Sequence, residues 1–259
     1  MAIPKKIHYC WFGGAPIPEK DQKCIDSWSR FCPDYEIIRW DESNYDLGKN
    51  AYTREAYEAK KWGFVPDYAR LDIVNAEGGI YLDTDVEVIK PFDDLLSMGL
   101  FCGFETKDKV AFGLGFGAEP GHPFLKKLLA PYEGIHFVNE DGSLNMLPSP
   151  EIQTPVLVND GLKLDGSYQV LLDDIHVLPV DWLCPQSFLT GKITITSNTH
   201  SIHRYAMSWA SESRKLQRDY AIKLCNHGIP EKAADTVAKI AAVIKTGDFD
   251  RIAGRVKRR

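Results

Sequence analysis

The stretch from Val65 to Ile89, VPDYARLDIVNAEGGIYLDTDVEVI, decides the fold of this chain. Its first half keeps apolar residues at helical spacing, with Pro66 where a first helical turn tolerates proline, so it predicts a helix. Gly78-Gly79 is typical of a helix end, because glycine adopts left-handed backbone angles without a Cβ clash. The β-branched and aromatic residues from Ile80 to Ile89 predict a buried strand directly after that helix.

Two aspartates, Asp83 and Asp85, interrupt this apolar strand. Residues two apart in a continuous strand point to the same face, so we expect both carboxylates to emerge together. Two like charges there are costly unless a cation offsets them, and Mn²⁺ or Mg²⁺ is the natural partner for carboxylate oxygens. The alternative is that the strand ends at Asp83 and that both aspartates are turn residues in water.

A second acid–base pair lies upstream, in the predicted helix. Asp67 and Arg70 are three residues apart and therefore share one helix face. Together with the apolar sequence on both sides of the two aspartates, this pair favours a functional site over a simple turn. The alternative for the pair itself is a surface salt bridge of little energetic consequence.

The size and composition fit one large globular domain, or one domain with an appendage: 259 residues, 44% hydrophobic and 26% charged. The formal net charge of −5 argues against general binding of nucleic acid, which needs a basic surface. No apolar run approaches the length of a membrane-spanning helix, and the first residues lack the apolar core of a secretory signal. The six cysteines form no CxxC pair, which indicates reduced thiols in a cytoplasmic protein.

The chain opens with a predicted strand, helix and strand over residues 7–12, 18–31 and 35–40. This β-α-β pattern is Rossmann-like but has no GxGxxG phosphate loop. Ligands bind beyond the carboxyl ends of strands in open α/β sheets, and Trp11 lies at such an end. Its indole is expected either to stack on a nucleobase or to pack in the core.

Further along, residues 100–105 and 110–118 predict a pair of strands joined by a hairpin turn. Gly113, Gly115 and Gly117 alternate in the second strand, which indicates either a close approach of ligand or backbone, or a twisted edge strand. Residues 151–159 predict a helix that begins near Thr154 and Pro155, where free N–H groups attract an anion or a sugar hydroxyl.

The last third of the chain contains a second chemical cluster and then helices. His203, Ser208 and Trp209 are candidates to complete a metal or phosphate site. From Ser211 onward the sequence predicts helices, followed by several Arg and Lys residues up to residue 259. This basic segment is interpreted either as a solvated tail or as a group that holds the protein near anionic lipid, at the inner face of a membrane.

Three blocks of this sequence resemble glycosyltransferase family 32, the DXD-containing sugar transferases that are related to the glucosylating domains of large clostridial toxins. The blocks stand in the family's order between residues 3 and 209. They are IPKKIHYCWFGG at residues 3–14, DYAR through GGIYLDTD at residues 67–85, and His203 with Ser208-Trp209.

The resemblance implies a GT-A fold, an α/β architecture in which helices flank a Rossmann-like mixed sheet. It places the catalytic domain at residues 1–210 and a helical C-terminal appendage with a basic tail at residues 211–259. It also implies a nucleoside-diphosphate sugar donor, usually UDP-linked, a Mn²⁺ or Mg²⁺ requirement, and retention of the anomeric configuration.

Position by position, the resemblance assigns roles to the residues named above. Trp11 matches the indole that stacks on the donor base, and Tyr81 and Asp83 match donor-contacting positions. Asp67 and Arg70 match the pair that holds the sugar and the diphosphate. Asp85 matches the direct metal ligand, His203 and Ser208 match the region of a further metal ligand, and Trp209 lies near the diphosphate.

The chain departs from the family around Gly113 to Phe116, where relatives often carry Asn or another polar residue. The residue that faces the reacting carbon therefore stays unidentified, with Gln153 and Thr154 as substitutes. Same-face attack on the sugar is favoured over a covalent intermediate, because no spare carboxylate stands out as a nucleophile. Two rival functions stay open: a metal-dependent nucleotidyltransferase, and a sugar-binding module without catalysis.

Overall fold

The computed structural model describes residues 2–253. The chain forms two compact units. The first comprises the residues up to 185 together with 195–204, and the second comprises 186–194 and the residues from 205 onward. The catalytic domain and the helical extension that we predict, divided between residues 210 and 211, stay a prediction of functional organisation.

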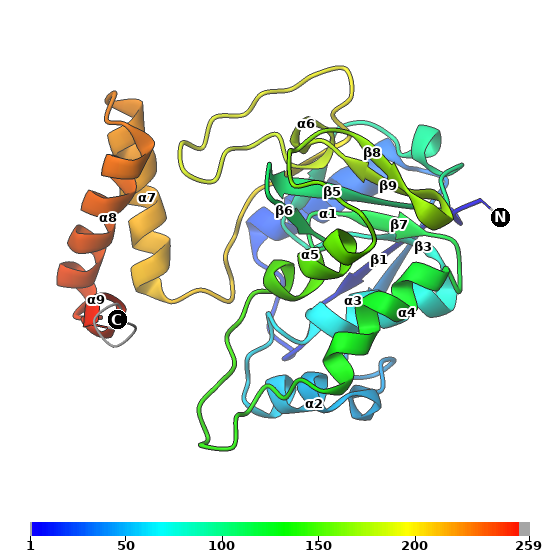
Figure 1. The fold of residues 1–259 in the computed structure, drawn as a ribbon, viewed down its shortest axis with the longest axis horizontal. Coiled ribbons are helices and arrows are strands. Elements are labelled where there is room, and N and C mark those ends of the chain that lie inside the picture. The colour runs from blue at the N-terminus through cyan, green and yellow to red at the C-terminus, as the bar shows by residue number, and fades with distance from the viewer. Residues whose placement is uncertain (1, 254–259) are drawn as a thin grey trace. The chain divides into compact units, whose positions relative to one another are not determined.

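A mixed β-sheet lies at the centre of the first unit (Figure 1). Within the described residues it has eight strands in the order β2-β1-β3-β7-β5-β9-β8, with β6 paired to β5. The strands are β1 (Lys6–Cys10), β2 (Glu36–Trp40), β3 (Gly79–Tyr81), β5 (Leu100–Thr106), β6 (Lys109–Ala111), β7 (Phe116–Ala118), β8 (Gln169–Leu171) and β9 (Ile175–Leu178). A separate antiparallel pair consists of β4 (Val86–Val88) and β10 (Ser201–His203).

Strand direction brings several carboxyl ends to one edge of the sheet. β1 runs parallel to β2 and to β3, and β5 runs parallel to β9. β7 lies antiparallel between β3 and β5, so those two strands also share a direction. The ends of β1, β3 and β5 therefore lie along the edge where open α/β sheets bind their ligands.

Helices cover both faces of this sheet (Figure 1). One face carries α3 (Pro66–Glu77), α4 (Pro123–Leu129) and α5 (Ser149–Asn159), and α2 (Ala51–Glu58) packs beside α3. The opposite face carries α1 (Glu19–Phe31), whose Trp28 packs against Tyr9 of β1, and α6 (Val180–Leu183), which contacts β5. The confirmed β1-α1-β2 opening and this mixed sheet between helices agree with the α/β architecture expected from the sequence.

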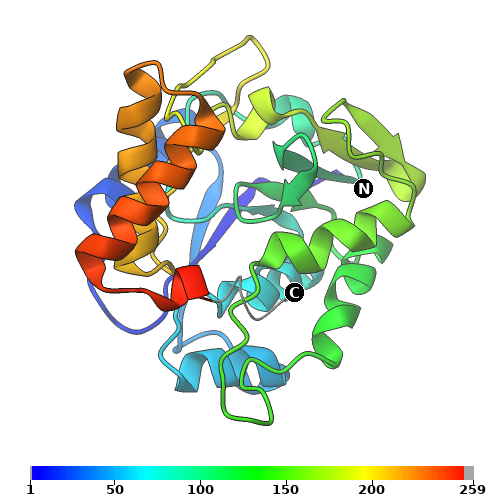
Figure 2. The ribbon, with the colours of Figure 1, turned by 60° about the vertical axis from the view of Figure 1, so that its left-hand side comes forward.

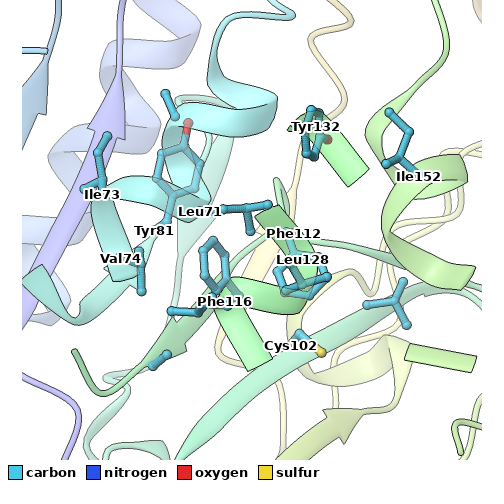
Figure 3. Packing of buried hydrophobic residues seen from close by; sticks show 14 of the residues in the cluster. Leu71, Ile73, Val74, Tyr81, Cys102, Phe112, Phe116, Leu128, Tyr132 and Ile152 are labelled. Carbon is cyan, nitrogen blue, oxygen red and sulfur yellow. The ribbon is translucent and has the colours of Figure 1, made fainter. Parts of the chain in front are cut away.

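A hydrophobic cluster fills the face under α3 and α4. Figure 3 shows Leu71 and Val74 of α3 close to Tyr81 and Phe116 of the sheet and Leu128 of α4. All five side chains are at most 1% exposed. Burial of an aliphatic or aromatic side chain contributes about 1.5–3 kcal/mol, so this cluster fixes the position of α3 on the sheet.

The end of α3 follows the predicted glycine stop. Gly78 adopts φ +63° and its N–H donates to the Val74 carbonyl, which closes the last turn. The buried His8 side chain then ties this turn to β1, since its Nε2 lies 2.9 Å from the Gly78 oxygen and Trp40 donates to its Nδ1. Burial lowers the pKa of His8, so the imidazole is neutral in this role.

The single strand predicted over residues 80–89 is wrong, because β3 ends at Tyr81 and β4 begins at Val86. The intervening residues form a turn in which the Val86 N–H donates to the Asp83 carbonyl. β4 then leaves the main sheet and pairs with β10, more than one hundred residues later in the chain. Asp83 and Asp85 therefore lie in a turn, not on one face of a continuous strand.

Two further expectations need correction. The second strand predicted over residues 110–118 is divided into β6 and β7 by the glycine-containing segment between them, although the hairpin between β5 and β6 is confirmed. The helix predicted to begin near Thr154 and Pro155 is α5, which begins at Ser149, so both residues lie inside the helix. Pro150 occupies the first turn and gives the actual start signal.

The second unit contains a helical hairpin, visible in Figure 2 as the yellow-orange to red pair. It consists of α7 (Glu212–Asn226) and α8 (Glu231–Thr246), and α9 (Asp250–Ala253) follows. Ser211 accepts a hydrogen bond from the Arg214 N–H and caps α7, which agrees with the helix predicted from that residue. None of the helices among residues 2–253 combines the length and apolar character that crossing a bilayer requires.

The link between α1 and β4 yields a stability prediction. The Ser27 Oγ accepts a hydrogen bond of 2.9 Å from the buried Val88 N–H. Ser27→Ala leaves that N–H without a partner, so we expect a loss of about 1–3 kcal/mol in the free energy of unfolding, measured by urea denaturation. Ser29→Ala in the same helix is the matched control, because Ser29 is exposed, and it is expected to change stability by at most about 0.5 kcal/mol. Equal losses in the two variants would contradict this role of Ser27.

Candidate functional site

The buried guanidinium of Arg70 is the centre of the candidate site. Its Nη2 lies 3.1 Å from Asp67 Oδ1 and 3.4 Å from Asp83 Oδ1, and its Nε donates to the Pro66 carbonyl at 2.9 Å. The Arg70 side chain is 5% exposed. Burial opposes its charge, but the neighbouring acidic groups more than offset that effect and raise the pKa of Arg70. The pair predicted as Asp67 and Arg70 is thus buried and part of a three-residue network with the partly exposed Asp83, not a surface salt bridge.

Asp67 is held by side chains from two other helices. The Tyr52 hydroxyl of α2 donates to its Oδ2 at 3.4 Å, and Gln153 of α5 donates to its backbone carbonyl at 3.4 Å. Burial raises the pKa of Asp67 to about 6, since the nearby Arg70 charge offsets only part of the desolvation and Asp83 adds repulsion. This carboxyl therefore titrates close to neutral pH, within reach of the guanidinium.

Asp83 directly follows the end of β3 and faces Arg70. The buried Tyr81 hydroxyl donates to its Oδ1 at 3.0 Å, and the Tyr81 ring stacks under the Arg70 guanidinium at 5.2 Å. The backbone N–H of Asp83 donates to the Gly113 carbonyl at 3.0 Å. Burial raises the pKa of Asp83, opposed by Arg70.

Gly113 provides the space for this ion pair. A Cβ atom at position 113 would lie 2.2 Å from Asp83 Oδ2 and 2.5 Å from Arg70 Nη1. No side chain fits there without moving both charged groups. Of the two interpretations given for Gly113, Gly115 and Gly117, the close approach of other groups therefore applies at Gly113.

Asp85 and His203 form a second pair at the end of the same turn. His203 Nε2 lies 3.4 Å from Asp85 Oδ1, and both side chains are about one-seventh exposed. The pairing of β10 with β4 creates this contact, because it aligns His203 with Val86. Burial alone would lower the pKa of His203, but Asp85 and Cys184 raise it well above its ordinary value.

The structure brings these candidate metal ligands together in part. Asp85 and His203 are adjacent, whereas the Asp83 carboxylate is turned to Arg70 and Tyr81. Among residues 2–253, no group of three or more His, Cys, Asp or Glu side chains is arranged to hold a metal ion. Any ion at this position would take its remaining ligands from substrate or water.

Trp11 lies where the sequence predicts it, immediately after β1 at the carboxyl edge of the sheet. Its side chain is half-buried, and its indole N–H donates to the Ala15 carbonyl at 2.6 Å, which links the side chain to the loop that follows. Base stacking by Trp11 stays a prediction.

The remaining predicted site residues lie in other surroundings. Ser208 and Trp209 belong to the second unit, where both are exposed and Arg214 stacks on the Trp209 ring at 5.6 Å. Gln153 is fully buried beside Asp67, and the Thr154 hydroxyl lies 3.1 Å from both the N–H and the carbonyl oxygen of Val110 in β6. Their roles toward donor, metal or reacting carbon stay predictions.

Glu105 is a carboxylate that the sequence did not single out. It lies near the end of β5, on the same strand face as Gly103, which packs against Leu183 of α6. Burial raises the pKa of Glu105. The charge of His203 lowers this pKa in part, and the charge of Asp85 raises it further. The direction of β5 in the sheet brings Glu105 to this edge. No motif in the neighbouring sequence predicts that position.

The geometry defines an α/β protein with an acidic site around one buried arginine, at the carboxyl ends of its parallel strands. Residues 18–101 match the family described as "Glycosyltransferase sugar-binding region containing DXD motif". This match confirms the resemblance to the DXD-containing glycosyltransferases that was drawn from the sequence.

Two curated proteins illustrate the similarity in sequence. Subversion of eukaryotic traffic protein A from Legionella pneumophila is 30% identical over 119 residues, which cover 36% of this chain and 18% of that protein. Inositol phosphoceramide mannosyltransferase 1 from Schizosaccharomyces pombe is 31% identical over 145 residues, or 52% of this chain and 42% of that protein. The chain thus spans less than half the length of these two relatives.

A solved structure supports the fold. The PaToxG glycosyltransferase superposes with a TM-score of 0.50 and 21% identity, over 62% of this chain and 70% of that one. This similarity supports the fold alone, and it confirms the GT-A architecture expected from the sequence.

Gly113 allows a direct test of the ion pair. We expect Gly113→Ala to push Asp83 and Arg70 apart and to lower the free energy of unfolding by about 1–3 kcal/mol, measured by urea denaturation. Gly134→Ala is the control, because a Cβ there meets nothing within 4 Å and its φ of −107° suits any residue. A Gly113→Ala protein as stable as the control would contradict the close approach.

Asp67 gives a pH prediction. A buried acid whose pKa rises from 3.8 to about 6 binds its proton more tightly when folded. Its contribution to stability is therefore fully present below about pH 4 and is lost as the pH rises through about 6, by about 2–3 kcal/mol.

The measurement compares wild type with Asp67→Asn by urea denaturation at several pH values. Because Asn does not titrate, the stability of wild type relative to the variant is expected to fall across the window from about pH 4 to about pH 7. A constant difference across this window would show that the Asp67 pKa is not raised.

Proposed function

We propose that this chain is a metal-dependent retaining glycosyltransferase that moves a sugar from a UDP-sugar to a hydroxyl group of a glycan, glycolipid or polysaccharide precursor. The proposal rests on the Arg70 guanidinium, which contacts both Asp67 and Asp83, and on the pair that Asp85 forms with His203. The family match over residues 18–101 supports sugar transfer. The lipid acceptor in the printed name of the Schizosaccharomyces relative supports glycolipid as one acceptor class.

Arg70 is the residue that we assign to the donor diphosphate or sugar. Its hydrogen bonds use Nε and Nη2, and among the described residues no partner is found for Nη1. A guanidinium held rigidly on one side offers its other donors to ligand oxygens at little entropic cost. Asp67 and Asp83 fix its orientation and accept hydrogen bonds from sugar or ribose hydroxyls.

Asp85 and His203 fit a divalent cation. A carboxylate oxygen and an imidazole nitrogen 3.4 Å apart suit Mn²⁺, and Mg²⁺ or Mn²⁺ commonly takes only one or two protein ligands together with substrate phosphates. A pair of protein ligands is therefore sufficient for an ion that arrives with the nucleotide. The ion supplies charge neutralisation for the departing diphosphate.

In the proposed reaction, the acceptor hydroxyl oxygen forms a bond to the anomeric carbon while the bond from that carbon to the diphosphate oxygen breaks. The hydroxyl proton passes to the departing phosphate on the same face, which retains the configuration. Arg70 stabilises the charge that develops on this oxygen. Tyr81 and Asp83 hold the guanidinium in place during the step.

The other assignments complete the donor site. Trp11 stacks on the base at the end of β1. Glu105 accepts a hydrogen bond from a hydroxyl of the bound sugars at the end of β5. The six cysteines are free thiols, five of them buried, from which we infer a cytoplasmic setting.

The test measures UDP release from UDP-glucose, UDP-galactose and their N-acetyl forms, with and without Mn²⁺. GDP-mannose is added because one relative is named a mannosyltransferase. We expect Mn²⁺-dependent release with at least one UDP-sugar. Asp85→Asn and Arg70→Lys are each expected to lower the turnover by about a hundredfold or more, since each removes charge stabilisation at the leaving group.

Asp108→Asn is the matched control, because it removes a carboxylate from the exposed β5–β6 turn, and it is expected to keep full turnover. Release of pyrophosphate instead of UDP would identify a nucleotidyltransferase. Donor binding without turnover would identify a sugar-binding module. Turnover of GDP-mannose alone would keep sugar transfer but overturn the UDP assignment.

A further inference from the structure

Residues 211–259 carry a net positive charge, although the chain as a whole is acidic. They contain twelve Lys and Arg against six Asp and Glu, a net charge of +6, whereas residues 1–210 carry −11. An acidic protein with one strongly basic segment is not explained by solubility alone. The basic segment is expected to face a negatively charged partner.

The same segment exposes a stripe of large aliphatic side chains. Val237, Ile240 and Ile244 follow each other at helical spacing along α8 and are 53%, 47% and 66% exposed. Phe249, just beyond the helix, is 61% exposed. We call Val237, Ile240, Ile244 and Phe249 the apolar stripe.

The apolar stripe is distinct from the face by which α8 packs in its own unit. Ala234, Ala238 and Ala242 recur at four-residue spacing and are fully buried, and α8 packs closely against α7. The small residues thus make the helix–helix contact, while the large aliphatic residues face away from it. Large exposed apolar groups in a row are typical of a docking surface.

Charge and apolar surface together favour an anionic bilayer as the partner. A polybasic segment gains about 1 kcal/mol per Lys or Arg near anionic headgroups, and buried apolar side chains supply the second signal that stable attachment needs. Pairing of two copies of the chain through this segment would bring two net positive segments together, so like-charge repulsion opposes it.

We propose that the C-terminal helices α7, α8 and α9 dock the protein on an anionic lipid bilayer, with the apolar stripe inserted at the headgroup boundary and the basic residues of this part of the sequence supplying the electrostatic attraction. Docking needs both features: the charge attracts the segment to the surface and the stripe holds it there. This proposal does not depend on the enzymatic activity proposed above, and its test has no enzymatic readout.

The test is co-sedimentation of the whole chain with vesicles of phosphatidylcholine alone or with about 30% phosphatidylserine. We expect binding to the anionic vesicles at least about tenfold stronger than to neutral ones, and loss of most of this binding in about 0.5 M salt. The double variant Ile240→Ser, Ile244→Ser is expected to weaken binding to anionic vesicles by about tenfold or more.

Leu172→Ser is the matched control, because Leu172 is 80% exposed in the other unit and its replacement is expected to leave vesicle binding unchanged. Circular dichroism confirms that each variant stays folded. Equal binding to neutral and anionic vesicles, or unchanged binding of the double variant, would overturn the proposal. Self-association in analytical ultracentrifugation that the double variant abolishes would identify a second copy as the occupant instead.

Discussion

One buried positive charge between two carboxylates organises this structure. Arg70 contacts both Asp67 and Asp83; the Arg70 and Asp67 side chains are almost closed to water, whereas that of Asp83 is 29% exposed. A buried ion pair is stable only when further hydrogen bonds satisfy its atoms, and Pro66, Tyr52 and Tyr81 supply them. The raised pKa of Asp67 reflects its burial first, and the nearby Asp83 carboxylate raises it further because one guanidinium does not neutralise two carboxylates.

The break between β3 and β4 gives the two aspartates of the turn different partners. Asp83 stays beside the main sheet and faces Arg70, whereas Asp85 is carried toward β10 and meets His203. A continuous strand would have put both carboxylates on one face with similar surroundings. In the proposed function, the turn separates Asp83, which would orient donor groups, from Asp85, which would hold a cation. On this view, the two carboxylates of a DXD motif have unequal tasks because the backbone turns between them.

Local sequence signals predicted the elements that depend on local interactions. The helix after Pro66, its end at Gly78 and the strand of β1 follow from residue spacing and glycine geometry. The strand break after Tyr81 did not follow, because β-branched residues continue on both sides and the partner of β4 lies more than one hundred residues away. A pattern read within a short window contains no information about such a pairing.

The site was foreseen where residue chemistry is unusual and missed where position alone matters. Asp67, Arg70, Asp83, Asp85 and His203 were named from their types and spacing, and the structure brings them into a group of three and an adjoining pair. Glu105 carries no local signal, since a glutamate near a strand end is ordinary until the sheet order places it at the shared edge. Gly113 was noticed as a departure, but its reason is the van der Waals space that Asp83 and Arg70 occupy.

The central claim is that the turn after β3 binds a nucleotide-linked divalent cation. The most direct measurement is anomalous diffraction at the manganese absorption edge from crystals grown with Mn²⁺ and UDP. The account predicts one strong anomalous peak within coordination distance of Asp85 and His203, with the diphosphate on the same ion and the base near Trp11. A nucleotide bound elsewhere, or manganese bound away from both side chains, would contradict it.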